Sequence, residues 1–102
     1  MLRLHTLFVF LLFVFISVYG AQTYSVKGVV TSHATGEGLP FVSVGIWNTP
    51  MGTMTDSLGN YFIGNLSPGM YRIQVSSVGY KTYVSPEFRI SSYDYTLDIA
   101  LE

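Results

Sequence analysis

The sequence predicts a single all-β sandwich domain, and three observations support that fold class. The chain has 102 residues, which is enough for one small domain and too few for two. From Gln22 onward, apolar and polar residues alternate with the period of two that is typical of strands, and no window shows helical spacing. Gly, Pro, Asn, Asp and Ser recur about every 8 to 12 residues, as turns do in a sandwich or barrel.

Residues 1–21 have the profile of an export signal peptide, so the domain is expected to comprise residues 22–102. Arg3 precedes the apolar run 7–16, and small residues follow where a signal peptidase would cut. Cleavage is expected after Gly20, which places Val18 at the minus-three position, or one residue later, after Ala21. A retained membrane anchor is the alternative, disfavoured because the run is shorter than the roughly 20 residues of a membrane span.

The composition of the remaining chain excludes several function classes. Four Lys and Arg residues stand against six Asp and Glu residues, a formal charge of −2, so nucleic acid is not an expected partner. Cysteine is absent, which removes disulfides, thiolate zinc sites and thiol nucleophiles. Export without cysteine suits the envelope of a Gram-negative bacterium.

The first four expected strands cover residues 24–31, 41–48, 53–55 and 61–66. The glycine-containing loop 32–38 ends the first strand, because glycine takes positive φ at little cost. In the second strand Val42, Val44 and Ile46 alternate with outward residues, which marks one face as core. Turns at 49–52 and 56–60 bound the short third strand, and the fourth places Tyr61 and Ile63 on one side.

Three further strands are expected at residues 70–78, 80–84 and 93–101. The first of these has the cleanest alternation, with Tyr71, Ile73 and Val75 facing inward. Gly79 breaks the run before the sixth strand, and Phe88 and Ile90 are assigned to the connection that follows. The seventh strand aligns four apolar residues, namely Tyr95, Leu97, Ile99 and Leu101.

Five segments in a fixed order resemble the carboxypeptidase regulatory-like domain. They are Val26-Lys27-Gly28-Val29-Val30, then Thr35 to Pro40 with Val42-Ser43-Val44, Gly52-Thr53 with Thr55 to Tyr61, Leu66 to Tyr71, and Val75 to Tyr80. The resemblance implies a seven-stranded, transthyretin-like (prealbumin-like) Greek-key β-sandwich without catalytic machinery. The last segment is most similar to domains at the N-terminus of TonB-dependent, SusC-like outer-membrane receptors of Bacteroidetes.

The matched residues also have expected structural roles, in addition to Gly28 in the first segment. Asp56 is expected to bond the amides of its own turn, with Gly59 in a conformation closed to other residues. Pro68 and Gly69 suit the centre of a type II turn, which leaves Tyr71 to enter the core and seek a partner for its hydroxyl.

Gly79 and Tyr80 close the last matched segment. Gly79 is expected to allow a bulge or a bend between sheets, and Tyr80 to cover it.

No catalytic, cofactor-binding or metal-binding residue is expected. His33 is the sole histidine after the leader, and the carboxylates lie far apart in the sequence. One surface feature suits a ligand: Trp47 faces outward, and with Tyr83, Tyr93 and Tyr95 it offers flat rings on which sugars could stack. Aromatic residues are also common on strands without any ligand.

Two functions from different classes follow. The first is a non-catalytic domain in the periplasm, part of an outer-membrane nutrient receptor, with the rest of the receptor chain or another envelope protein as partner. The second is a stand-alone secreted or cell-surface sandwich that binds a glycan or a surface protein. In both, the mature chain is expected to be a monomer without a cofactor or a membrane span. The bare sheet edge that could pair with another chain is not evident from the sequence.

Overall fold

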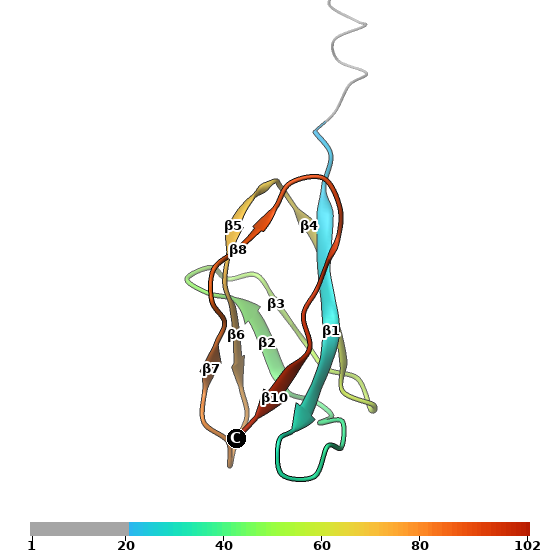
Figure 1. Cartoon of the computed structure of the whole chain (residues 1–102), viewed down its shortest axis with the longest axis vertical. Coiled ribbons are helices and arrows are strands. Elements are labelled where there is room, and N and C mark those ends of the chain that lie inside the picture. Colours follow the sequence, from blue (N-terminus) through green and yellow to red (C-terminus); the bar gives the residue numbers. More distant parts are fainter. Residues whose placement is uncertain (1–20) are drawn as a thin grey trace, which may run out of the picture.

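The computed structural model describes residues 21–102, which form strands and turns without a helix (Figure 1). Within these residues no helix is long and apolar enough to cross a membrane. The strands are β1 (Tyr24–Ser32), β2 (Ser43–Ile46), β3 (Gly52–Met54), β4 (Asn60–Leu66), β5 (Gly69–Tyr71), β6 (Ile73–Ser76), β7 (Tyr83–Val84), β8 (Phe88–Ile90), β9 (Tyr95–Thr96) and β10 (Ile99–Leu101). The expected signal peptide falls on residues 1–21, almost wholly outside the described part.

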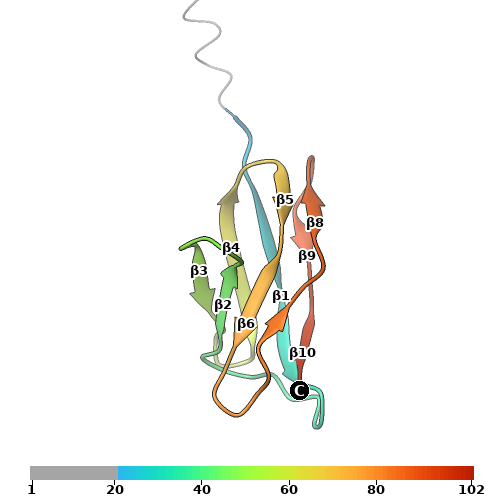
Figure 2. The ribbon, with the colours of Figure 1, turned by 90° about the vertical axis from the view of Figure 1, so that its left-hand side faces the viewer.

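The strands form two layers that pack face to face (Figure 2). One layer has the order β10-β1-β4, with β9 also paired to β1, and the other has the order β3-β2-β6-β7. A short β5-β8 pair continues the second layer along the chain, because β5 runs into β6 and β7 leads into β8. The predicted all-β sandwich is therefore confirmed.

Strand β1 is hydrogen-bonded along both of its edges. It pairs antiparallel with β4 on one side, with Gly28 opposite Tyr61, and parallel with β9 and β10 on the other. The register aligns Val26 and Val30 with Ile63 and Ile99. These side chains all point into the space between the layers, so the alternation of the sequence is translated directly into one buried face.

Seven extended stretches lie where strands were expected and β8 is an eighth, and the limits of the expected strands differ from those observed. The expected strand 70–78 is interrupted at Arg72, and the expected strand 93–101 is interrupted between β9 and β10. The second strand begins at Ser43, because Phe41 has left-handed backbone with φ of 56°. Trp47 lies in the turn that follows it.

The assignment of Phe88 and Ile90 to a connection was wrong. Both residues lie in β8, which pairs with β5, and both are buried. Pro86 led to the misassignment because it interrupts the strand pattern. The chain resumes its pairing only two residues after this proline.

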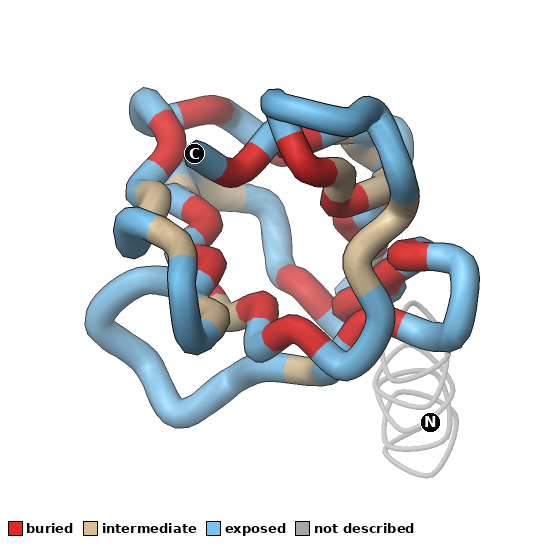
Figure 3. Tube along the Cα trace, turned by 90° about the horizontal axis from the view of Figure 1, so that it is seen from below, coloured by how far each residue is buried: buried red, intermediate tan, exposed pale blue. Residues whose placement is uncertain are grey.

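The core is a single cluster of buried apolar side chains that line the inner faces of both layers. In Figure 3 the buried residues, in red, recur along the strands and alternate with exposed residues, in pale blue. The cluster consists of Val26, Val30, Val42, Val44, Ile46, Tyr61, Ile63, Leu66, Ile73, Val75, Phe88, Ile90, Ile99 and Leu101. Burial of each of these side chains stabilises the fold by about 1.5 to 3 kcal/mol. All of them lie within residues 22–102, which therefore carry a core of their own.

Gly28 and Gly59 are among the glycines at which backbone segments approach more closely than any side chain would permit. A Cβ at Gly28 would lie 1.9 Å from the carbonyl oxygen of Leu97, which lies between β9 and β10. A Cβ at Gly59 would lie 2.6 Å from the Val30 oxygen and 2.9 Å from the Leu39 nitrogen, and its φ is +89°. Both positions fix how closely the neighbours of β1 can pack against it.

A comparison of Gly59→Val with Gly36→Val separates this close approach from backbone strain. Both glycines have positive φ, but a Cβ at Gly36 meets nothing within 4 Å. Gly36→Val should therefore lower the free energy of unfolding by about 1 to 2 kcal/mol, the cost of left-handed backbone. Gly59→Val should cost about 4 kcal/mol or more, because backbone must also move. Urea denaturation of both variants measures the difference, and equal losses would contradict the close contact.

Candidate functional site

The candidate ligand residue Trp47 lies in the turn that connects β2 to β3. Its backbone N–H donates to the Arg72 carbonyl at 2.8 Å, which ties this turn to the break between β5 and β6. The turn is closed by Thr49, whose N–H and hydroxyl both donate to the Ile46 carbonyl, at 3.2 and 2.9 Å. Trp47 is thus held on a rigid turn at the margin of the second layer.

The Trp47 ring lines a shallow hollow of about 270 Å³. The Arg72 guanidinium carbon lies 5.8 Å from the ring centroid, a cation–π arrangement. Met70 and Glu87 also line the hollow. The Trp47 side chain is about half exposed, and no carboxylate of residues 21–102 forms an ion pair with Arg72. The hollow thus combines a flat aromatic ring with one positively charged and one negatively charged side chain, those of Arg72 and Glu87.

The other aromatic residues named as stacking candidates do not join Trp47. Tyr83 and Tyr95 are partly buried against the core, and Tyr95 stacks on Phe88 with ring centroids 4.4 Å apart. Tyr93 is exposed, in the turn before β9. The expectation for Tyr83 and Tyr95 was wrong because they pair in register with Val75 and Val26, whose side chains point inward.

The turn between β3 and β4 is organised by Asp56. Its Oδ1 accepts the backbone N–H of Leu58 and of Asn60, both at 2.9 Å, and its Oδ2 accepts the Asn60 side-chain amide at 3.2 Å. These hydrogen bonds, of which the Asn60 backbone bond is the strongest influence, hold the pKa of Asp56 below its ordinary value. Gly59 lies inside this turn.

The segment from Pro68 to Tyr71 differs from its expected geometry. Gly69 is the first residue of β5 and does not have positive φ, so a type II turn centred on Pro68 and Gly69 was wrong. The left-handed residue here is Asn65, with φ of 59° at the end of β4. Tyr71 is half-buried, and its hydroxyl donates to the Ser67 carbonyl, which clamps the corner between β4 and β5.

Tyr61 is the most buried of the tyrosines singled out in the sequence. It is 4% exposed and donates its hydroxyl proton to the Leu97 carbonyl, the oxygen that closely approaches Gly28. Burial, followed by the charge of Asp98, raises the pKa of Tyr61 above its ordinary range. The Tyr61 hydroxyl therefore links β4 to the segment between β9 and β10, on the other side of β1.

Gly79 and Tyr80 lie in the turn between β6 and β7. Gly79 has φ of +88° and open space around it, and β6 and β7 pair within one sheet, so it serves a turn and neither the expected bulge nor the expected bend between sheets. Tyr80 packs partly against the core.

Buried and partly exposed polar side chains that the sequence analysis missed stabilise the irregular backbone. The Thr55 hydroxyl donates to the Leu39 carbonyl at 2.6 Å and accepts the Val42 N–H at 2.8 Å, on both sides of left-handed Phe41. The Ser85 hydroxyl accepts the Ile73 N–H at 2.9 Å, beside the break at Arg72. Their roles depend on chain segments distant in sequence, so no local pattern marks them.

Asp94 and Asp98 play the same role for β1. Asp94 accepts the Ser25 N–H and Asp98 accepts the Val29 N–H, both at 2.9 Å. The Asp94 carboxylate replaces a backbone partner just before β9, and the Asp98 carboxylate does so between β9 and β10. Their spacing of four residues, which matches that of Ser25 and Val29, is the one signal that the sequence offered.

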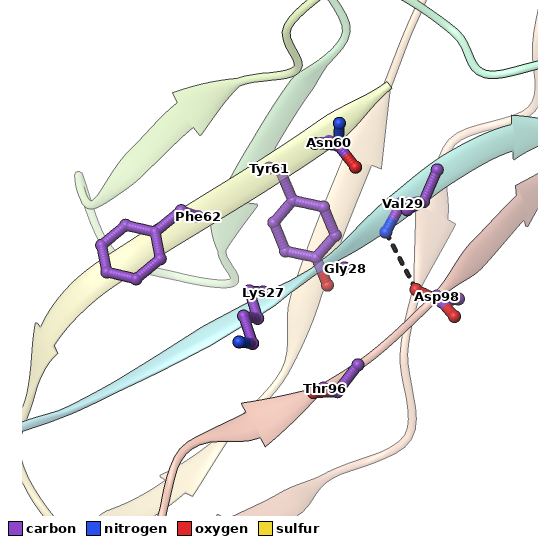
Figure 4. Close-up of a pocket in the computed structure, with 8 residues that line it drawn as sticks. All are labelled: Lys27, Gly28, Val29, Asn60, Tyr61, Phe62, Thr96 and Asp98. Carbon is purple, nitrogen blue, oxygen red and sulfur yellow. Dashed lines mark hydrogen bonds between the residues drawn. The ribbon is translucent and has the colours of Figure 1, made fainter. Parts of the chain in front are cut away.

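The outer face of the first layer has two further shallow hollows, on either side of Phe62. One, of about 320 Å³, is lined by Lys27, Thr96 and Asp98 among others (Figure 4). The other, of about 290 Å³, extends toward Tyr24 and Asn65. In Figure 4 the Phe62 ring stands beside β4, away from the Tyr61 ring.

The described residues offer little for acid–base or metal chemistry. His33 is exposed and lies 3.9 Å from Glu102. Among residues 21–102, no three His, Asp or Glu side chains gather where they could hold a metal ion.

Comparison with known proteins identifies a family. The model of the family described as "Carboxypeptidase regulatory-like domain" matches residues 25–102. No relative was found among curated proteins.

Solved structures of other proteins share the fold. Two are chains of Coh3ScaB–XDoc complexes, which are interface mutants of a type II cohesin–X-dockerin complex from Acetivibrio cellulolyticus. Their TM-scores are 0.64 and 0.63, with 21% identity over 76% of this chain. The Bacillus anthracis TIE protein has a TM-score of 0.61 and 19% identity over 78% of this chain. The match spans only 56% of the first two chains and 16% of the third, so the likeness concerns the fold alone.

The Asp56 turn should give the fold an acid-sensitive contribution. Because the folded-state pKa of Asp56 lies below its unfolded value near 3.8, its stabilisation is present above that pH. It is lost as the pH falls through the folded-state pKa. The free energy of unfolding should therefore drop more steeply with acid in the wild type than in Asp56→Asn, as urea denaturation between about pH 6 and pH 2 would measure. Parallel curves would show that the carboxylate charge does not stabilise the turn.

Proposed function

The chain belongs to the carboxypeptidase regulatory-like domain family, and from this membership we propose that it is a non-catalytic interaction domain of the bacterial envelope. We further propose that it serves as the N-terminal periplasmic domain of a TonB-dependent outer-membrane nutrient receptor. Its partner would then be the rest of the receptor chain or another envelope protein. The observation that carries the proposal is the family match over 25–102, together with the export profile of residues 1–21.

The positions of the motif residues support a role in interaction. Gly28 and Gly59 permit close backbone contacts, Asp56 organises a turn, and the Tyr61 and Tyr71 hydroxyls hold carbonyl groups of the chain. Each of these groups is occupied in maintaining the sandwich. The matched segments therefore specify a scaffold, and the outer surface is left for contact with a partner.

The shapes of the described hollows support the same proposal. The three hollows described above are shallow, and none brings together a nucleophile, a general base and an oxyanion donor. Trp47, Tyr71, Arg72 and Met70 line one of them, and these residue types are enriched at protein interfaces.

The Trp47 hollow also favours a second candidate function, the binding of a glycan. A half-exposed indole ring on a rigid turn, with Arg72 and Glu87 nearby, offers a stacking surface and hydrogen-bonding groups together. This function would suit a stand-alone secreted or cell-surface domain.

Export is tested by expression of the full chain with its own leader in a Gram-negative host. The proposal predicts that the chain is recovered from the periplasm and that its N-terminus is Ala21 or Gln22, as measured by intact mass. Leu11→Arg, which interrupts the apolar run, should leave the precursor in the cytoplasm. A full-length chain in the membrane fraction would contradict the proposal.

The receptor context is tested at the gene. A reading frame for a plug and barrel that continues from the codon for Glu102 or adjoins it would support the receptor domain. An unrelated neighbouring gene would contradict it.

Trp47 distinguishes the two candidate functions, because it is the only tryptophan of the chain. A receptor domain should show no saturable change in tryptophan fluorescence with oligosaccharides. A glycan-binding domain should show binding by calorimetry that Trp47→Ala weakens by roughly 2- to 13-fold, since stacking contributes about 0.5 to 1.5 kcal/mol. Tyr93→Ala, an exposed ring outside the hollow, is the matched control. A glycan array without hits would eliminate the second candidate.

A further inference from the structure

Trp47 and Arg72 lie side by side on the outer face of the second layer. Each is adjacent to a buried isoleucine, because Ile46 of β2 is opposite Ile73 of β6. The hydrogen bond from the Trp47 N–H to the Arg72 carbonyl continues this pairing by one residue. Since side chains alternate between the two faces of a sheet, the side chains next to the isoleucines are directed outward, and both are exposed.

The Arg72 guanidinium is held in position without being neutralised. Its carbon lies 5.8 Å from the Trp47 ring centroid, so the ring restricts the conformations of the arginine side chain. Glu87 lines the same hollow, yet within residues 21–102 it forms no ion pair with Arg72. The planar N–H fork of an arginine matches the geometry of a carboxylate and binds it through two parallel hydrogen bonds. A ligand in the hollow therefore meets a ring, a cation and an acceptor that are not paired with one another.

The charge around the hollow is opposite in sign to that of the whole domain. Met70, which lines the hollow, is opposite Arg89 in the β5–β8 pair, and both residues are exposed. Among the residues that line the hollow or pair with its lining, two arginines accompany one glutamate, which gives a local formal charge of +1. Residues 22–102 together carry −2, from four cations and six anions. This contrast favours a ligand with negative charge.

The size of the hollow limits how much of a ligand it receives. Its volume of about 270 Å³ is smaller than the roughly 300 to 1,000 Å³ of pockets that enclose a drug-sized ligand. Ile46 and Tyr71 contribute apolar surface to its lining. An open hollow of this size suits one ring of a larger ligand, whose other units lie over the surrounding surface.

We propose that the Trp47 hollow binds an acidic sugar, namely a uronic acid residue within a glycan chain. This proposal rests on the glycan-binding candidate function and names its ligand class. The C–H face of the sugar ring stacks on the Trp47 indole, the carboxylate pairs with Arg72, and a hydroxyl donates to Glu87. Arg89, opposite Met70, attracts the carboxylate of a neighbouring unit.

Other ligand classes use only part of this arrangement. An aspartate or glutamate side chain of a partner protein supplies a carboxylate, but it has no ring to cover the indole and no hydroxyl for Glu87. A neutral sugar supplies the ring and the hydroxyls, but it leaves Arg72 with neutral acceptors, whose hydrogen bonds are weaker than those of a carboxylate. A uronic acid satisfies all three side chains.

Three kinds of probe test the ligand class on residues 22–102. They are tetramers of galacturonate and of glucuronate, the full methyl esters of these tetramers, and a tetraglutamate peptide. The esters keep the sugar rings without the charges, and the peptide keeps the charges without the rings. Because Trp47 is the only tryptophan, its indole N–H gives a single NMR signal that reports on the hollow.

At least one acidic tetramer should shift the indole signal and bind more tightly than its ester at low salt. The expected preference is roughly 2- to 5-fold, the range of an exposed ion pair, and it should disappear near about 0.5 M salt. Tetraglutamate should leave the signal in place. These results together would support a site for acidic sugars.

The opposite results separate this proposal from the candidate function on which it rests. Esters that bind as tightly as the acids would overturn the proposal and leave glycan binding intact. A peptide that shifts the signal as strongly as the acids would overturn it in favour of an acidic protein segment. No shift with any tetramer up to about 10 mM would also overturn it, and the glycan array would then decide independently whether any glycan binds.

Variants that change one charge locate the ion pair. Arg72→Gln should abolish the preference for the acids over the esters, whereas Arg72→Lys, which keeps the charge without the planar fork, should retain part of it. Lys27→Gln removes the same charge from an exposed position of β1 in the first layer and should leave the preference unchanged. Thermal unfolding establishes that each variant is folded. A preference that persists in folded Arg72→Gln, or is lost in Lys27→Gln, would overturn the proposal.

Discussion

The fold depends on the pairing of β1 along both of its edges. The strands on either side come from distant parts of the chain, and at two glycines their backbones approach β1 to distances that no side chain would allow. Tyr61 crosses this point and donates its hydroxyl proton to the Leu97 carbonyl, which joins β4 to the last stretch over Gly28. The first layer is thus fixed as a unit, and the second layer packs on the inner face that this unit presents.

The irregular parts of the sandwich are stabilised by polar side chains where main-chain partners are missing. The Thr55 hydroxyl forms hydrogen bonds on both sides of Phe41, whose backbone is left-handed. The Ser85 hydroxyl accepts the Ile73 N–H beside the break between β5 and β6, and Asp94 and Asp98 accept N–H groups of β1. Among the described residues, no buried side-chain nitrogen or oxygen lacks a partner. Because an unpaired polar group inside the sandwich would be costly, these side chains permit the breaks in the strands without loss of the fold.

Because the matched residues maintain the fold, a binding function is left to the surface. The matched segments form turns, close backbone contacts and the core, whereas the half-exposed Trp47 ring has no comparable structural role. A scaffold with a shallow hollow that is lined by an aromatic ring and by charged groups of both signs is suited to binding other molecules. This division of labour underlies the proposed role as an interaction domain.

The sequence by itself determined the all-β class, every extended stretch except β8, most of the inward faces and the glycine at the Asp56 turn. Those features follow from alternation and local turn chemistry, which act between residues near in sequence. Tertiary structure alone decided that Phe88 and Ile90 belong to a strand, that Gly69 is extended, and that Tyr83 and Tyr95 face the core. It also decided which distant carbonyls Thr55 and Tyr61 bond. Such choices depend on pairing register between segments far apart in the chain, which no local pattern encodes.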